Sequence, residues 1–219
     1  MLVKERMSHP VLTVHPEVPI FDALKRMREE HVRRFPVADK RGRLLGIVSE
    51  KDLLHAAPSD VTSLNIWEIQ YWVSKVTVEK VMTRKVITIT EDTPLEEAAR
   101  IMADNKIGAL PIMRDSKVVG IITETDLFKI FLEMLGAREP GVRLDILVPK
   151  VAGELAKLTG AIYEAGGNIL ALGTFLGVSS DNWEVTIKVS GLDNTTLVST
   201  IEPFVERILD VRIGKGSLR

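Results

Sequence analysis

Two short segments of the sequence each place a hydroxyl and a carboxylate three residues apart. Ser49 and Asp52 stand in GIVSEKD, and Thr123 and Asp126 stand in GIITETD. A carboxylate in the first turn of a helix can accept hydrogen bonds from two vicinal hydroxyls, as acidic residues do when they hold a ribose. The free N–H groups of a helix N-terminus also favour an anion such as phosphate. The same pattern is a frequent helix start, so the residues leave two readings open: a pair of mononucleoside sites or a pair of helix caps.

The two segments belong to a longer internal repeat. Residues 7–27 align with residues 82–102, and Pro36 aligns with Pro111, before one residue is lost in a polar turn. A length change confined to a turn is typical of a structural repeat. Each copy reads strand, helix, strand, turn, strand, helix, so the hydroxyl and the aspartate fall where the last strand ends and the last helix begins.

The first helix of each copy carries apolar residues at helical spacing. The predicted buried faces are Ile20, Ala23, Leu24 and Met27 in one copy, and Leu95, Ala98, Ala99 and Met102 in the other. Thr93, Pro94 and Glu96 form the pattern of a capping box at the start of the second of these helices. Gly46 and Gly120 open the two motif segments and permit a close approach of the backbone.

The rest of the chain differs from the repeat. Apolar residues at Leu64, Trp67, Trp72 and Val76 predict an amphipathic helix between the copies. We favour a helix that packs on the repeat pair over one that forms a binding surface. After a Gly- and Pro-containing linker, the order β-α-β-β-α-β predicts a ferredoxin-like domain, in which WEVTIKV alternates as a half-exposed antiparallel strand. We therefore predict an α/β (α+β) fold. The boundaries are 1–60 and 79–135 for the two copies, 61–78 for the helical segment between them, 136–142 for the linker and 143–213 for the last domain.

Composition excludes several functional classes. The chain has no cysteine, which excludes disulfides, thiolate metal sites and a cysteine nucleophile, and which is consistent with the reducing cytoplasm. A net charge of −1 with 5% aromatic residues lacks the basic excess of a nucleic-acid-binding protein. No apolar run is long enough to predict a membrane span. Because no metal-ligand pair, nucleophile elbow or P-loop is present, we predict no metal site, no catalytic residues and no enzymatic activity.

The two copies resemble a tandem pair of CBS domains, a Bateman module. The resemblance covers about residues 1–135 and rests on the two motif segments together with MSHPVLTV, MTRKVITI, FPVAD and LPIMR. It implies clefts that bind AMP, ADP or ATP as a ligand and not as a catalytic cofactor. In this family the aspartate holds the ribose, the hydroxyl faces ribose or phosphate, and residues around the proline surround the base. The resemblance places Val11, Arg33, Arg34, Phe35, Pro36, Ser49 and Asp52 in a first site, and Thr83, Val86, Ala109, Leu110, Pro111, Thr123 and Asp126 in a second. Arg33 or Arg34 is the candidate phosphate contact.

The C-terminal segment resembles an ACT domain over about residues 143–213. GELAKLTGAIYEAGGNI is close to the first helix of that family and its Gly-x-Asn-Ile end. The resemblance implies dimerisation through this domain, and an effector site at Lys150, Gly153 and Asn168, although Lys150 stands where amino-acid-binding members carry an aspartate. Two CBS motifs followed by an ACT domain are similar to the AcuB-type acetoin-utilisation proteins. This similarity implies control of a protein partner in acetoin- or acetyl-CoA-linked metabolism.

The sequence therefore favours a regulatory adenine-nucleotide sensor that forms a homodimer and modulates an unidentified protein partner. Three alternatives stay open. They are a scaffold with degenerate nucleotide sites, an amino-acid sensor that acts through the ACT domain, and an unrecognised enzyme. Binding of nucleotides, binding of free amino acids and turnover of a nucleotide distinguish these alternatives.

Overall fold

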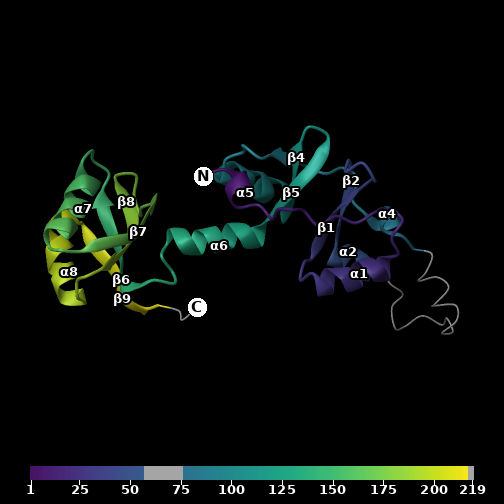
Figure 1. Ribbon diagram of the computed structural model, residues 1–219. Coiled ribbons are helices and arrows are strands. Elements are labelled where there is room, and N and C mark those ends of the chain that lie inside the picture. Colours follow the sequence, from purple (N-terminus) through teal and green to yellow (C-terminus); the bar gives the residue numbers. More distant parts are fainter. Residues whose placement is uncertain (57–75, 217–219) are drawn as a thin grey trace. The chain divides into compact units, whose positions relative to one another are not determined.

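The computed structural model describes residues 1–56 and 76–216, which form two compact units, Met1–Leu127 and Phe128–Arg219 (Figure 1). The helix predicted for residues 61–78 falls mostly outside the described residues. The first unit holds both copies of the repeat up to the first turn of the last helix of the second copy. The second holds the predicted order β-α-β-β-α-β.

The first copy forms a two-stranded antiparallel sheet and two helices around one apolar core. α1 (Ile20–Glu29) precedes β1 (Arg34–Ala38), and β2 (Leu44–Ser49) leads into α2 (Glu50–His55). Upstream of α1, Val14 adds one parallel bridge to β1. All four residues of the predicted α1 face are buried, because their spacing puts them on the side of the helix that faces the core.

The second copy repeats this order. β3 (Ile89–Thr90) runs parallel to β4 (Ala109–Arg114), which pairs antiparallel with β5 (Lys117–Thr123). α5 (Leu95–Asn105) connects β3 to β4, and α6 (Glu124–Met134) follows β5. The structure thus confirms the two strands and the polar turn predicted for LPIMR and the residues after it.

The start of α5 differs from the prediction. Pro94 occupies the N-cap position, and no side chain caps the helix. The Thr93 hydroxyl instead accepts a hydrogen bond of 3.2 Å from the Thr90 N–H. The predicted capping box is therefore wrong, and Thr93 closes the turn that precedes the helix.

Each copy of the repeat pairs with the short segment that precedes the other copy in the sequence. We call residues 1–8 and 76–83 the leading segments, since each precedes one copy of the repeat. The first contains a short 3-10 turn, η1 (Val3–Glu5). Backbone hydrogen bonds of 2.9 and 3.3 Å join Ser8 to Ile121 of β5 in the second copy. The first leading segment therefore pairs with the second copy.

The second leading segment makes the reciprocal crossing. Two backbone hydrogen bonds of 2.9 Å join Thr83 to Ile47 of β2 in the first copy. α4 (Val78–Val81) precedes this pairing, and Val78 and Met82 are buried in the core of the first copy. Neither copy is complete without the leading segment of the other.

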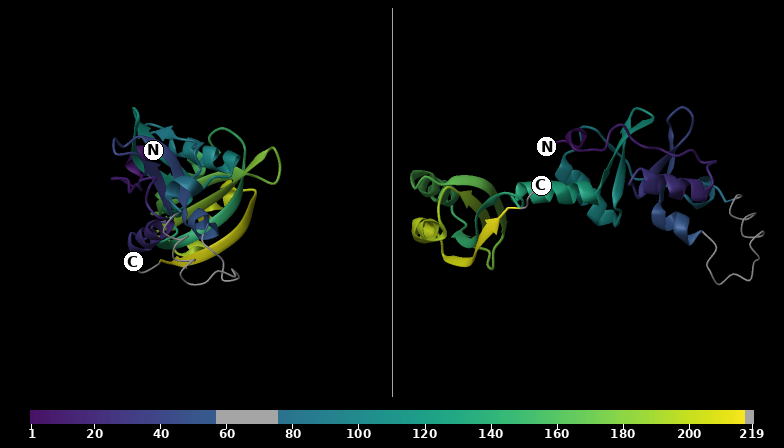
Figure 2. Two further views of the ribbon diagram at one scale, coloured as in Figure 1. Left: turned by 90° about the vertical axis from the view of Figure 1, so that its right-hand side faces the viewer. Right: turned by 60° about the horizontal axis from the view of Figure 1, so that its bottom comes forward.

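The second unit is a four-stranded antiparallel sheet with the strand order β7-β8-β6-β9. α7 and α8 lie on one face of this sheet (Figure 1), and the further views agree (Figure 2). Apolar residues of β6, β8, α7 and α8 form its core. The elements are β6 (Pro140–Pro149), α7 (Glu154–Glu164), β7 (Asn168–Leu176), β8 (Asn182–Ser190), α8 (Asn194–Ile201), the 3-10 turn η2 (Glu202–Phe204) and β9 (Arg207–Lys215).

The other face of β8 is covered, which corrects the prediction of a half-exposed strand. Lys188 is 5% exposed and Thr186 is 7% exposed. The Lys188 ammonium donates a hydrogen bond of 2.7 Å to the carbonyl oxygen of Gly136, in the turn after α6. The Thr186 hydroxyl donates one of 2.6 Å to Asp145. These hydrogen bonds satisfy the polar groups on the covered face.

Candidate functional site

Ser49 and Asp52 cap α2 reciprocally. The backbone N–H and the hydroxyl of Ser49 donate to Asp52 Oδ2 at 2.8 and 2.6 Å, and the Asp52 N–H donates to Ser49 Oγ at 3.2 Å. Within the described part of the chain, no further hydrogen bond engages the other carboxylate oxygen, Oδ1. The cap fixes the orientation of a half-buried carboxylate and leaves one of its oxygens able to accept from a ligand.

Thr123 and Asp126 repeat this geometry at the start of α6. The backbone N–H and the hydroxyl of Thr123 donate to Asp126 Oδ2 at 2.9 and 2.7 Å, and the Asp126 N–H donates to Thr123 Oγ1 at 3.4 Å. The register is also repeated, since Arg34 lies opposite Ser49 and Ala109 lies opposite Thr123. The duplication therefore extends from the sequence to individual atoms.

The leading segments bring one residue of each copy to the motif of the other. The family resemblance placed Thr83 in the second site. The structure pairs Thr83 with Ile47, two residues before Ser49, and so brings it to the first motif. Ser8 pairs with Ile121, two residues before the hydroxyl of the second motif. Aligning the two copies could not predict that each leading segment pairs with the other copy, because an alignment shows which residues are similar and not which residues are in contact.

The residues predicted to surround a base are mostly packed inside the protein. Five are buried side chains of β1 and β4: Phe35, Pro36, Ala109, Leu110 and Pro111. Phe35 and Leu110 are 0% exposed, so their side chains fill the interior of the protein. Their assignment as base contacts stays a prediction. Val11 and Val86 are half-buried and keep their candidate role.

Arg33 and Arg34 are adjacent at the start of β1, but their side chains lie in different places. Arg33 is exposed and lines a hollow of about 340 Å³ beside the end of α1, together with Arg28, His31 and Glu50. Arg28 and His31 are basic residues at this hollow that were not among the predicted site residues. Their signal was the cluster of basic residues from the end of α1 to the start of β1, of which only Arg33 and Arg34 were singled out.

Arg34 is half-buried, and its guanidinium reaches the second copy. A Cβ atom at Gly108 would lie 2.5 Å from Arg34 Nη2 and 2.6 Å from Glu124 Oε2. The Gly108 carbonyl accepts a hydrogen bond of 3.2 Å from the Glu124 N–H, so these atoms stand at the junction of β4 and α6. No ion pair within 4.0 Å involves Arg34 in the part of the chain that the structure describes.

Two carboxylates with lowered pKa values serve the fold. Arg114 donates hydrogen bonds of 2.6 and 2.7 Å to Glu91, which hold the pKa of Glu91 below its ordinary value. The backbone N–H of Thr196 donates to Asp193 at 3.0 Å and lowers the pKa of that carboxyl, which caps α8. Asp193 is thus a helix-capping aspartate in the second unit, far along the chain from both motifs.

The structure does not bring the three predicted effector residues of the second unit together. Lys150 and Gly153 precede α7, whereas Asn168 follows it at the start of β7. A helix of this length rises about 16 Å, at about 1.5 Å per residue. The Lys150 ammonium lies 4.3 Å from the centre of the Trp183 ring, a cation–π contact within the protein. A single small ligand in one chain therefore cannot touch all three.

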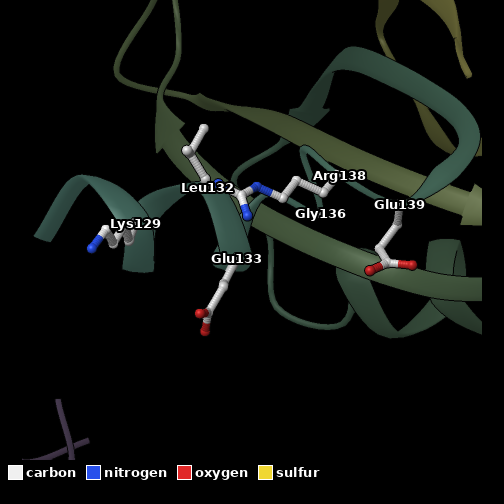
Figure 3. Close-up of a pocket in the computed structure, with 6 residues that line it drawn as sticks. All are labelled: Lys129, Leu132, Glu133, Gly136, Arg138 and Glu139. Carbon is white, nitrogen blue, oxygen red and sulfur yellow. The ribbon is translucent and has the colours of Figure 1, made fainter. Parts of the chain in front are cut away.

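A larger hollow of about 460 Å³ lies beside the C-terminal end of α6 (Figure 3). Its lining residues are Lys129, Leu132, Glu133, Gly136, Arg138 and Glu139. Arg138 reaches back toward Leu132, whereas Lys129 and Glu133 point away from it (Figure 3). The charged groups therefore do not converge on one bound molecule.

Residues 1–56 and 76–216 contain no helix that is both long and apolar enough to cross a membrane. Nor do three His, Asp or Glu side chains in these ranges gather into a group that could hold a metal ion.

The CBS domain matches residues 3–59 and 78–133, which together make up just over half of the chain. The chain belongs to the CBS domain family. Tandem CBS domains and the mixed α/β fold of a CBS pair are thereby confirmed. The assignment of residues 143–213 to an ACT domain stays a prediction.

Two relatives illustrate the range of proteins that carry this pair. A CBS domain-containing protein of Dictyostelium discoideum is 29% identical over 136 residues, which are 62% of this chain and 94% of that protein. L-aspartate semialdehyde sulfurtransferase of Methanocaldococcus jannaschii is 32% identical over 131 residues, which are 59% of this chain and 23% of that enzyme. This chain thus corresponds to nearly all of one relative and to less than a quarter of the other.

Solved structures with the same fold contain bound adenosine compounds. A CBS domain pair in complex with 5′-methylthioadenosine and S-adenosyl-L-methionine is 32% identical, with a TM-score of 0.50 over 60% of this chain and 95% of that one. CBSX2 in complex with AMP is 28% identical, with a TM-score of 0.52 over 61% and 97%. A protein assigned to acetoin utilization (AcuB) from Vibrio cholerae is 29% identical, with a TM-score of 0.53 over 64% and 96%.

Proposed function

We propose that this protein is a non-catalytic, cytoplasmic regulatory sensor that binds an adenine nucleotide of the AMP, ADP or ATP type at its CBS pair. The observation that carries the proposal is the repeated cap, in which the hydroxyl and the aspartate hold each other at the end of a strand. Related CBS pairs have been solved with AMP, S-adenosyl-L-methionine and 5′-methylthioadenosine. These ligands share an adenosine moiety, so the ribose is the group that a common carboxylate would recognise.

The geometry suits a ribose at the first motif. Asp52 is held through Oδ2, so its orientation is fixed before a ligand arrives. Its Oδ1 is then able to accept from a ribose hydroxyl without breaking the helix cap. A site arranged in advance loses less conformational freedom on binding than one that must first order its side chains.

The test is calorimetric titration with AMP, ADP, ATP, S-adenosyl-L-methionine and 5′-methylthioadenosine. Wild type is compared with Asp52→Ala and Asp126→Ala. We expect saturable binding that is lost at the matching site in each variant. Asp193→Ala is the matched control, since it also removes a helix-capping aspartate and leaves both motifs intact. Equal binding by all four proteins would contradict the proposal.

A scaffold with degenerate nucleotide sites is the second candidate. The observation that favours it is that one oxygen of each aspartate is already engaged in a helix cap. On this reading Asp52→Ala destabilises the fold in the way that Asp193→Ala does, and wild type binds none of the five ligands. The titration above therefore decides between the two candidates.

An amino-acid sensor is the third candidate. The separation of Asn168 from Lys150 and Gly153 by the length of α7 weighs against it. A thermal shift of wild type in a free amino acid, lost in Lys150→Ala, would revive this candidate. Turnover of a nucleotide by the pure protein would likewise revive an enzymatic function.

We further propose that the second unit acts as an ACT-type dimerisation domain, and that it pairs with a second copy of the chain through β7. β7 and β9 are the two edges of the sheet. β9 carries Arg207, Asp210, Arg212 and Lys215, whereas β7 (NILALGTFL) has no charged residue and no proline. Charged side chains and prolines normally protect exposed edges from pairing with another chain. An unprotected edge of nine residues supports antiparallel pairing with the same edge of a partner copy.

The dimer is tested by light scattering after size-exclusion chromatography. Leu176→Lys places a charge at an 83% exposed position of β7, and Ile213→Lys does the same at a 69% exposed position of β9. We expect wild type and Ile213→Lys to run as dimers and Leu176→Lys to run as a monomer. A monomeric wild type would refute the dimer, and loss of the dimer only in Ile213→Lys would move it to the other edge.

The regulated partner and pathway are proposed on likeness to the AcuB protein of Vibrio cholerae. We propose that ligand binding changes the affinity of the dimer for a protein of acetoin- or acetyl-CoA-linked metabolism. A ligand shifts such an equilibrium only by its differential affinity for the two states. Normal growth on acetoin after deletion of the gene would contradict the pathway.

A further inference from the structure

We infer that the two adjacent arginines serve different sites, and that Arg34 of the first copy supplies the phosphate-binding charge of the second motif, at Thr123 and Asp126. The inference rests on the proposed nucleotide function. It refines the prediction that placed Arg33 and Arg34 together in the first site.

The second copy lacks most of the basic residues that the first carries. Around the junction of helix and strand the first copy has Arg28, His31, Arg33 and Arg34, and the second has Ala103, Lys106, Gly108 and Ala109 at the aligned positions. His31 and Lys106 even share the same left-handed backbone, with φ of 54° in both. A phosphate at the second motif would therefore meet one cation of its own copy, Lys106.

Arg34 brings a second cation there. Its backbone lies opposite Ser49 in the first copy, but its Nη2 would be 2.5 Å from a Cβ at Gly108. Gly108 stands directly before β4, and its carbonyl accepts from the N–H of Glu124, the first residue of α6. The charge of Arg34 thus reaches the junction of β4 and α6, the helix that Thr123 and Asp126 start.

The absence of a side chain at Gly108 is what makes room for the guanidinium. Any Cβ there would be too close to both Arg34 Nη2 and Glu124 Oε2. In the first copy the aligned residue is Arg33, which itself lies by Glu50, the counterpart of Glu124. Each motif therefore has one arginine beside the glutamate that opens its helix, and both arginines come from the first copy.

A half-buried guanidinium without an ion pair among the described residues suits a phosphate ligand. Its planar N–H groups donate to phosphate oxygens in a fixed geometry, and such charge-assisted hydrogen bonds are stronger than neutral ones. The inferred ligand of the second motif is therefore a nucleotide with a 5′-phosphate, and adenosine is the matched compound without it.

The experiment isolates one motif at a time. Asp52→Ala leaves the second motif intact and Asp126→Ala leaves the first. Calorimetric titration with AMP and with adenosine is made in each background, with Arg33→Ala or Arg34→Ala added. In the Asp52→Ala background we expect Arg34→Ala to lower the affinity for AMP about ten- to hundredfold, which is the range for the loss of a hydrogen bond to a charged group. The affinity for adenosine should change by less than about twofold, because adenosine lacks the phosphate that accepts this hydrogen bond.

One control variant and one further test variant guard against a general effect of the substitutions. Arg41→Ala removes an arginine of the β1–β2 turn and is expected to change neither ligand. Gly108→Ala removes no charged group but puts a methyl group 2.5 Å from the present position of Arg34 Nη2 and 2.6 Å from that of Glu124 Oε2, so these atoms must move. Like Arg34→Ala, Gly108→Ala is expected to lower the affinity for AMP and to leave the affinity for adenosine unchanged. Circular dichroism verifies that each variant is folded.

Several outcomes would overturn the inference. Loss of AMP binding on Arg34→Ala only in the Asp126→Ala background would return Arg34 to the first site. Loss on Lys106→Ala with none on Arg34→Ala would assign the phosphate to the second copy's own lysine. Failure of wild type to bind either ligand would instead defeat the proposed function, and the inference with it.

Discussion

Gly46 and Gly120 occupy matching positions in the two copies, yet the structure predicts different costs for a methyl group at each. A Cβ at Gly46 would lie 2.7 Å from Met82 Sδ and 2.8 Å from the backbone oxygen of Thr83. At Gly120 the nearest atoms are all side-chain atoms, the closest being Met7 Sδ at the far end of a flexible side chain. We predict that Gly46→Ala is strongly destabilising and that Gly120→Ala is nearly neutral.

The size of each destabilisation depends on whether backbone or side-chain atoms must move to admit the methyl group. Thr83 is held by its two backbone hydrogen bonds to Ile47. Displacing its carbonyl disrupts the bond that it accepts from the Ile47 N–H, worth about 1 kcal/mol, and overpacking a buried site adds about 1–3 kcal/mol. Gly46→Ala should therefore lower the free energy of unfolding by about 2–4 kcal/mol. At Gly120 only side chains give way, and the lower entropy of the unfolded chain returns about 0.4–1 kcal/mol. The net change there should be within about 1 kcal/mol.

The assay is urea unfolding followed by circular dichroism. If the two units unfold separately, the shift is read from the transition of Met1–Leu127. Gly160→Ala in α7 is the control, since a Cβ there meets nothing within 4 Å and the change should stabilise the helix slightly. An equal loss of stability in Gly46→Ala and Gly120→Ala would refute the reasoning, because it would mean that the backbone of Thr83 is not the obstacle.

Three further predictions concern stability. Lys188→Met keeps the length of the side chain but leaves the Gly136 carbonyl without its donor, so it should lower the free energy of unfolding by about 1–3 kcal/mol in urea titrations. Ser49→Ala removes a helix-capping hydroxyl and should cost about 1 kcal/mol by the same measurement. Glu91 has a pKa lowered from 4.5 by its hydrogen bonds from Arg114, so its contribution is complete above about pH 4.5 and is lost as pH falls through the lower folded value. Glu91→Gln should therefore lose less stability than wild type on acidification below pH 4.5, as thermal melts across pH would record, and parallel curves would contradict this.

Local elements of the repeat were predictable from sequence because their causes are local. The apolar spacing of Ile20, Ala23, Leu24 and Met27 set the buried face of α1. The Ser/Thr-x-x-Asp pattern set the helix starts at both motifs, with reciprocal hydrogen bonds. Gly166, with φ of 86°, ends α7 as the Gly-Gly pair indicated.

What the sequence could not give depends on partners that are distant along the chain. The two leading segments look alike, so no pattern tells which copy each will join, and the pairing of Thr83 with β2 was missed for that reason. Alternation in β8 predicted an exposed polar face, but the turn after α6 covers it and satisfies Lys188 through Gly136. The family resemblance likewise placed Arg33 and Arg34 together in the first site, whereas the Arg34 guanidinium reaches the space left by Gly108 in the second copy.

The crossing of the leading segments has a consequence for synthesis on the ribosome. His9 and Val119 are joined by a hydrogen bond of 2.8 Å although they lie 110 residues apart in the chain. At ordinary elongation rates, translation needs roughly 5–20 s to cover that distance. Throughout that interval the first leading segment lacks the strand of the second copy with which it pairs. Neither copy can therefore be completed before the second copy has been synthesised. In kinetic terms the two CBS motifs should therefore fold as one unit, with slow formation of the contacts that are most distant in sequence.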